Sequence, residues 1–224
     1  DEPVLDVCSI DSIREISPDE LDFFDNRAAL QSGSHGADDM STSWIFAKTD
    51  APLCSILCVP KIGIAAGTCK GSIRLWNLLT GQCSGNLLGH TAEVTCMKNF
   101  GEDQLVSCSL DANIKIWNLM TGACIRSLLG HSRPVLWVDV LPSNNLITAS
   151  QDKTLKIWDA PKGKCVHTMT GHSAPVNCCI VMSEPPQRIV SASNDRLIKM
   201  WSFAGQFQRT LPKGHTDAVT CLVG

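Results

Sequence analysis

A Gly-His dipeptide returns at a nearly constant interval, and this repeat constrains the fold of the 224-residue chain more than any other feature. Its histidines are 41, 41 and 43 residues apart, at His90, His131, His172 and His215. Four tryptophans keep the same intervals, and an aspartate precedes the last three by six residues. Features that share one period of about 40 residues indicate a chain built from copies of one small structural unit.

Each unit shows the pattern of four short β-strands. In the second unit, residues 94–98, 105–109, 114–117 and 124–128 are predicted strands, and turn-forming residues separate them. Residues 114–117 alternate between apolar and polar positions, as a half-buried strand does. No unit shows the period of a helix, so the sequence predicts an all-β fold.

These units resemble the WD40 repeat of β-propellers, through the Gly-His, an SxxD-like turn and an IxIWD-like ending. The resemblance is strong for residues 89–201 and covers about 41–224 when degenerate units are included. It implies blades of four antiparallel strands at about 49–89, 90–130, 131–171 and 172–214, with the start of another at 215–224. Propellers of this family usually have seven blades, so we expect an incomplete arc whose remaining blades come from outside this chain.

The first unit departs from the pattern. Thr49 occupies the histidine position and Lys70 the aspartate position, so this blade is expected to lack a polar network. Residues 44–48 are predicted to form the outermost strand of a preceding blade, and residues 215–224 to contain the innermost strand of a following one. The edge strands of such an arc would be prone to association.

Residues 1–40 differ from the rest in charge. They hold 11 of the 22 acidic residues and only two basic ones, so the remaining residues carry a net charge of +6. We expect an acidic, flexible N-terminal segment or a join to an upstream domain. Within it, residues 16–30 (ISPDELDFFDNRAAL) contain a helix start. A short docking helix and a disordered linker both stay open for this stretch.

A histidine, a hydroxyl residue and an aspartate recur in phase with each tryptophan. One interpretation is a catalytic triad for acyl transfer. The other is the structural tetrad that the resemblance implies, in which the four side chains are joined by hydrogen bonds. Three identical sets are redundant for catalysis and no GxSxG motif is present, so we predict no catalytic residue and no enzyme. The predicted tetrads are His90, Ser107, Asp111, Trp117; His131, Thr148, Asp152, Trp158; and His172, Ser191, Asp195, Trp201.

The 12 cysteines are too sparse for a disulfide-stapled protein, and we expect a reducing compartment. Cys54 with Cys58, and Cys178 with Cys179, lack the paired spacing of zinc sites. The cysteines, among them the in-phase residues Cys83, Cys124 and Cys165, are therefore predicted to be small buried strand residues. No metal and no cofactor is expected.

Three lysines, Lys115, Lys156 and Lys199, lie two residues before their tryptophans. Strand alternation predicts that they occupy a solvated face. No aromatic residues interleave with them, as single-strand binding would require, so nucleic-acid binding is not expected.

Function is expected at exposed positions that differ between repeats. In proteins of the resembled family, partners often bind the narrow face around the central channel. Leu110 and Leu136 would be apolar anchors on an otherwise polar rim. The candidate partner-binding residues are Glu93, Thr95, Leu110, Arg133, Pro134, Leu136, Gln151, Pro175, Asn177, Asn194, Ala218 and Thr220.

The leading prediction is a non-catalytic scaffold or adaptor that binds protein partners or peptide segments through this face and helps to assemble a multiprotein complex. The alternative is a docking or substrate-recognition region of a larger enzyme or ubiquitin-ligase assembly whose catalytic part lies outside this chain. TGxC turns at residues 80–83 and 121–124 resemble those of ubiquitin-ligase substrate receptors, but an F-box-like helix is absent. No apolar run could span a membrane and no secretory signal is present, so we expect the cytoplasm, with the nucleus as a second location.

Overall fold

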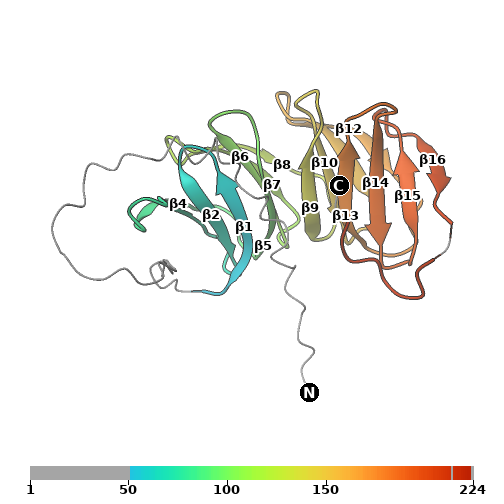
Figure 1. Ribbon diagram of the computed structural model, residues 1–224, viewed down its shortest axis with the longest axis horizontal. Coiled ribbons are helices and arrows are strands. Elements are labelled where there is room, and N and C mark those ends of the chain that lie inside the picture. The colour runs from blue at the N-terminus through green and yellow to red at the C-terminus, as the bar shows by residue number, and fades with distance from the viewer. Residues whose placement is uncertain (1–50, 213, 223–224) are drawn as a thin grey trace, which may run out of the picture.

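The computed structural model describes residues 51–212 and 214–222, and these residues form four antiparallel sheets of four strands each (Figure 1). They contain no helix, which confirms the predicted all-β fold. It follows that none of them forms a helix long and apolar enough to cross a membrane. Four features of the sequence analysis lie outside the described residues: the acidic segment 1–40, the candidate helix 16–30, the strand predicted at 44–48, and Thr49.

In each sheet the strands lie side by side in the order of the sequence. The first sheet comprises β1 (Leu53–Val59), β2 (Gly63–Thr68), β3 (Ile73–Trp76) and β4 (Cys83–Leu87). The second comprises β5 (Val94–Asn99), β6 (Gln104–Ser109), β7 (Ile114–Asn118) and β8 (Cys124–Leu128). The third comprises β9 (Val135–Val140), β10 (Leu146–Ser150), β11 (Leu155–Asp159) and β12 (Lys164–Met169). The fourth comprises β13 (Val176–Met182), β14 (Arg188–Ser193), β15 (Ile198–Trp201) and β16 (Phe207–Thr210).

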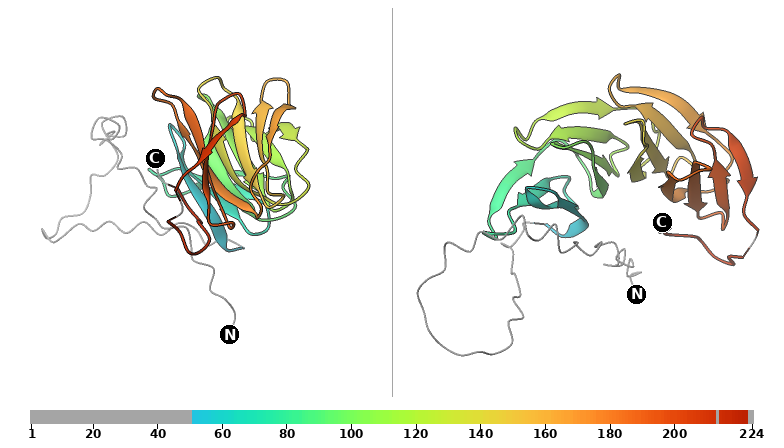
Figure 2. Two further views of the ribbon diagram at one scale, coloured as in Figure 1. Left: turned by 90° about the vertical axis from the view of Figure 1, so that its right-hand side faces the viewer. Right: turned by 45° about the horizontal axis from the view of Figure 1, so that its top comes forward.

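The sheets stack face to face and form an open arc (Figure 2, right). The innermost strands contact one another in sequence, β1 with β5, β5 with β9 and β9 with β13. Burial follows this arrangement, because β10 is buried at every residue whereas β12 is buried only at its last. A strand covered by a neighbouring sheet on both faces needs apolar or paired residues at every position.

The apolar cores lie between the sheets and not within any one of them. One core combines Leu75 and Leu87 of the first sheet with Val94 and Trp117 of the second. A second joins the second sheet to the third, and a third joins the third sheet to the fourth. Each unit therefore needs a neighbour to bury its faces, as in other repeat proteins.

The repeated glycine before each histidine is required by a close approach. Gly89, Gly130 and Gly171 have φ angles of 151°, 151° and 148°, a region that residues with a Cβ rarely adopt. A Cβ at Gly130 would also lie 3.2 Å from the indole of Trp158. The glycine and the tryptophan thus recur together because one packs against the other.

The last described residues differ from the sequence prediction. Residues 214–222 contain no strand, although they occupy the place beside β13 where an innermost strand was expected. The N–H of Val219 donates to the carbonyl of Ser193, and its side chain packs against Cys178 and Ala192. These contacts hold the segment on the fourth sheet without a ladder of hydrogen bonds.

Polar side chains on the innermost strands tie adjacent sheets together. Ser55 Oγ donates to the carbonyl of Val94 at 2.8 Å, and Thr95 Oγ1 donates to that of Val135 at 2.7 Å. The corresponding bond after the fourth sheet runs from Asn177 Nδ2 to the carbonyl of Val219. Leu136 has no polar atom for such a bond between the third and fourth sheets.

Replacing Thr95 by valine should destabilise the arc, because the carbonyl of Val135 loses a donor from the neighbouring sheet. We expect the free energy of unfolding in urea to fall by about 1–2 kcal/mol. Thr91→Val is the matched control, since Thr91 is exposed and its hydroxyl makes no hydrogen bond with the described residues. Equal stability of the two variants would contradict the role assigned to the bond.

Candidate protein-binding face

The histidine, hydroxyl, aspartate and tryptophan of each complete repeat form one hydrogen-bonded chain. In the third sheet, His131 Nδ1 lies 2.7 Å from Asp152 Oδ2, and its Nε2 lies 2.7 Å from Thr148 Oγ1. Trp158 Nε1 donates to the same hydroxyl oxygen at 2.9 Å. The consistent assignment has the hydroxyl donating to Nε2 and Nδ1–H donating to the carboxylate, with the imidazole neutral.

The second and fourth sheets repeat this geometry. The histidine–aspartate distances are 2.9 Å for His90 and 2.7 Å for His172, and the histidine–hydroxyl distances are 2.8 Å in both. The indole bonds to Ser107 and Ser191 measure 2.8 and 2.9 Å. The structure therefore brings all twelve predicted tetrad residues together in three equivalent sets.

The hydroxyls of these sets are not placed to act as nucleophiles. Ser107, Thr148 and Ser191 are 0% exposed, and each hydroxyl oxygen already accepts the indole N–H. A nucleophile must reach a substrate carbonyl from a pocket that also holds an oxyanion site. The geometry of these sets supports the structural interpretation over the catalytic one.

Burial controls the charge state of each set. Desolvation lowers the pKa of His131 below its usual value and outweighs the opposing effect of Asp152. The pKa values of His90 and His172 are lowered for the same reason. Burial alone would raise the pKa of Asp152, but hydrogen bonds from Thr154 and His131 hold it below its usual value.

The first sheet lacks a tetrad. Ala66 lies opposite Arg74 in the register where Ser107 lies opposite Lys115, so no hydroxyl is available. Thr68 and Ser72 instead bond to each other across the β2–β3 turn, with 2.9 Å between their hydroxyl oxygens.

The candidate binding residues gather in pairs at one end of the sheets. The N–H of Leu110 donates to the carbonyl of Glu93 at 3.0 Å, and that of Gln151 donates to Pro134 at 2.9 Å. In the fourth sheet, Asn194 donates to Pro175 at 3.0 Å. The loop before each innermost strand is thereby held against the turn before each tetrad aspartate, and together these loops and turns form what we call the loop face.

Exposure differs along the loop face. Arg133, Asn194 and Thr220 are exposed, and the other nine candidates are half-buried. Leu110 and Leu136 are among the half-buried ones, and their role as apolar anchors stays a prediction. The polar atoms of Thr95 and Asn177 are engaged in bonds between sheets.

Sequence reasoning missed two basic residues on the loop face. Lys153 and Arg196 directly follow the tetrad aspartates, have φ angles of 71° and 69°, and are exposed. Each turn is shaped by its aspartate, whose Oδ1 accepts the N–H of Thr154 or Leu197. Both residues come directly after the tetrad aspartate of their repeat, and this shared position is the sequence pattern that could have identified them.

The prediction that the in-phase cysteines are buried was wrong. Cys83, Cys124 and Cys165 are exposed, because they lie at or next to the start of the outermost strands, which no other sheet covers. Of the described residues, no group of His, Cys, Asp and Glu could hold a metal ion.

Of the three in-phase lysines, Lys199 does not lie on the predicted solvated face. Lys199 is only 8% exposed, and its Nζ donates to the hydroxyl of Thr210 at 3.1 Å. Lys115 and Lys156 are half-buried and donate to hydroxyls on β8 and β12 at 2.8 Å. The alternation of residues along a strand did not predict the burial of Lys199, because that burial depends on the strand paired with β15.

Comparison with known proteins agrees with this architecture. The family model described as "WD domain, G-beta repeat" matches residues 81–118, 122–159 and 163–202. Mitochondrial division protein 1 of Chaetomium globosum is 44% identical over 50 residues, which are 22% of this chain and 8% of that protein. The proteins of that name from Malassezia globosa and Aspergillus clavatus are 51% and 46% identical over 35 and 43 residues, or 16% and 19% of this chain and 5% and 6% of theirs. The chain therefore matches only a small part of these relatives.

Replacing Thr148 by valine keeps the shape of the side chain but leaves His131 Nε2 and Trp158 Nε1 buried without a partner. We expect the free energy of unfolding to fall by about 2–5 kcal/mol. The exposed Thr170 offers a matched control, and Thr170→Val should change stability by less than about 0.5 kcal/mol. If urea titrations give similar values for the two variants, the tetrad does not stabilise the sheet.

The chain should lose stability on mild acidification. Because the pKa values of the tetrad histidines are lowered in the folded state, the unfolded chain binds more protons below about pH 6.5. The free energy of unfolding should therefore fall as the pH drops from about 7 to about 5, and the lowered aspartate pKa values extend the loss below about pH 4.

Urea unfolding at pH 7, 6 and 5 measures this dependence. His131→Gln removes one of the three groups and should reduce the slope between pH 7 and pH 5 by about a third. A free energy of unfolding that stays level or rises on acidification would show that the histidines are not held neutral.

Proposed function

The chain belongs to the WD40 repeat family, and from this premise we propose that it is a non-catalytic scaffold that binds protein segments through its loop face. The observation that carries the proposal is the set of three backbone bonds that pair Glu93 with Leu110, Pro134 with Gln151 and Pro175 with Asn194. The same rigid backbone presents different side chains in each sheet. A rigid scaffold with variable exposed positions is the usual arrangement of a binding site.

The charge of the loop face favours acidic segments. Arg133, Lys153 and Arg196 are exposed on the third and fourth sheets, and none of them forms an ion pair with another described residue. The carboxylates of Asp152 and Asp195 accept hydrogen bonds from a histidine and from backbone N–H groups, and neither forms an ion pair with Lys153 or Arg196. Guanidinium and ammonium groups left unpaired at a surface are suited to carboxylates of a partner.

The matched relatives limit how far the proposal extends. They are named for mitochondrial division, but the similarity covers at most 8% of each of them. The proposal therefore concerns the repeats as a binding module within a larger assembly, and not that process.

Reversing two charges on the loop face should remove partner binding. We expect the full chain carrying Arg133→Glu with Lys153→Glu to lose most of the proteins that the unaltered chain retains in affinity purification with quantitative mass spectrometry. Both side chains are exposed, so the free energy of unfolding should change by less than about 0.5 kcal/mol. Circular dichroism checks that the fold is kept.

The matched control is Lys61→Glu with Lys164→Glu, which makes the same charge change at exposed residues away from the loop face. This variant should retain the same proteins as the unaltered chain. Retention of those proteins by the loop-face variant would reject this face as the site, and a chain that enriches no protein over a bead control would reject the scaffold function.

A further inference from the structure

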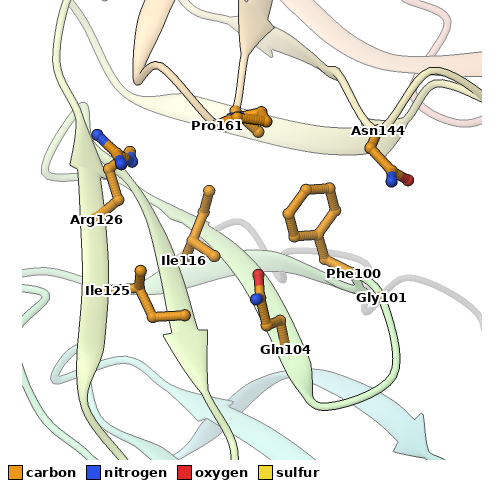
Figure 3. Close-up of a pocket in the computed structure, with 9 residues that line it drawn as sticks. Phe100, Gly101, Gln104, Ile116, Ile125, Arg126, Asn144 and Pro161 are labelled. Carbon is orange, nitrogen blue, oxygen red and sulfur yellow. The ribbon is translucent and has the colours of Figure 1, made fainter.

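A cavity of about 340 Å³ lies between the second and third sheets, outside the loop face. The cavity is lined by residues of both sheets. These are Phe100, Ile116, Ile125 and Arg126 from the second sheet and its loops, and Ala160 and Pro161 from the third. Figure 3 shows Arg126 on one side of this space, Phe100 on the other and Ile116 between them. We call it the inter-sheet groove. Its volume is at the lower end of the range of about 300–1,000 Å³ that ligand pockets occupy.

The groove exists because one residue type differs between repeats. The residue two after each tetrad tryptophan packs into the space between its own sheet and the preceding one. At this position Leu119 packs into the core between the first and second sheets, and Phe203 packs against the core between the third and fourth. The equivalent residue between the second and third sheets is Ala160, which has a smaller side chain and lines the groove.

The walls of the inter-sheet groove remain partly open to solvent. Phe100, Ile116 and Ala160 are buried, whereas Ile125 is 46% exposed and Pro161 is exposed. Exposed apolar side chains around a cavity are typical of a site that a partner covers.

Arg126 supplies a cation at the edge of the inter-sheet groove. The aliphatic part of its side chain lies over Gly163, where an added Cβ would come within 2.8 Å of Arg126 Cδ. Its guanidinium donates no hydrogen bond to a described residue. The carboxylate of Asp159 is engaged by Lys162 Nζ at 2.8 Å. Arg126 also helps to lower the pKa of Asp159, but it forms no ion pair with a described residue, so its N–H groups can donate to a ligand.

The inter-sheet groove and the loop face lie at opposite ends of the sheets. Gly101 belongs to the β5–β6 turn, Asn144 to the β9–β10 turn and Pro161 to the β11–β12 turn. The tetrad aspartates lie in the β6–β7 and β10–β11 turns, which antiparallel pairing places at the other end. Occupation of one site therefore leaves the other open.

We propose that the inter-sheet groove is a second docking site, which takes a leucine or phenylalanine side chain of a partner protein segment with a carboxylate beside it that pairs with Arg126. The inserted side chain occupies the place that Leu119 and Phe203 fill in the neighbouring interfaces. The acidic residue next to it meets the free guanidinium. The site does not depend on the loop face.

The probe is the peptide acetyl-Gly-Asp-Leu-Phe-Asp-Gly-amide, titrated into the full chain with ¹³C-labelled isoleucine methyl groups. We expect the NMR signals of Ile116 and Ile125 to shift, with a dissociation constant below about 1 mM. A peptide with alanine in place of leucine and phenylalanine should not bind, and one with lysine in place of both aspartates should bind at least about tenfold more weakly.

Filling the groove from within should abolish binding. We expect Ala160→Phe, which copies Phe203, to remove the peptide-induced shifts and to raise the Tm by about 2–4 °C. Ala160→Leu, which copies Leu119, is the second variant if phenylalanine does not fit. Ala204→Phe is the matched control, because Ala204 is exposed and lies outside the groove, and it should bind like the unaltered chain.

Arg126→Glu tests the charge and should weaken binding of the acidic peptide at least about tenfold. The loop-face variant Arg133→Glu with Lys153→Glu should bind the peptide normally, so the two proposals fail separately. The inference is overturned if the peptide causes no shift at Ile116 and Ile125, or if a folded Ala160→Phe or Ala160→Leu variant binds it as well as the unaltered chain does.

Discussion

The structure depends on the burial of both faces of every sheet against a neighbour. A single four-stranded sheet of this chain has apolar residues on both sides, and the cores combine residues from two consecutive sheets. Removal of apolar surface from water is the main favourable term in folding, so the units gain their stability by stacking. The matched repeats of the family model begin near an outermost strand and end at the third strand of the next sheet, so each matched unit spans a contact between two sheets.

The buried hydrogen-bonded tetrads add specificity to this stacking. Tryptophan, hydroxyl, histidine and aspartate satisfy one another inside the sheet, and the aspartate also holds the loop and the turn at its end. A buried polar group without a partner is costly, so the four residues must recur together. Because they are committed to the frame, binding has to use residues outside the repeated set. The loop face and the inter-sheet groove both arise where neighbouring repeats differ.

Much of the fold could be predicted from the sequence because the repeated residues act locally. The strands of the second unit were predicted to within a residue at each end, since their turns and alternation lie in the sequence itself. The burial of Lys199 and the exposure of the in-phase cysteines could not be predicted in this way. Whether Lys199 faces water depends on the strands and sheets around it, and whether Cys124 is covered depends on its place at the outer edge. The unpaired C-terminal segment also differs, because Val219 is held by two side-chain and backbone contacts without a ladder.

The sequence by itself determined the repeat, the all-β units and the sets of residues that form the tetrads, because each of these follows from residue type at a regular spacing. Only the tertiary structure decided which faces are covered and which cavities remain. Ala160 looks unremarkable along the chain, and it becomes significant only when Leu119 and Phe203 are seen to fill the equivalent spaces. The same holds for Arg126, because the Asp159 carboxylate whose pKa it helps to lower forms its ion pair with Lys162. The physical reason is that packing volume and charge pairing are properties of two sheets in contact, and no single repeat contains them.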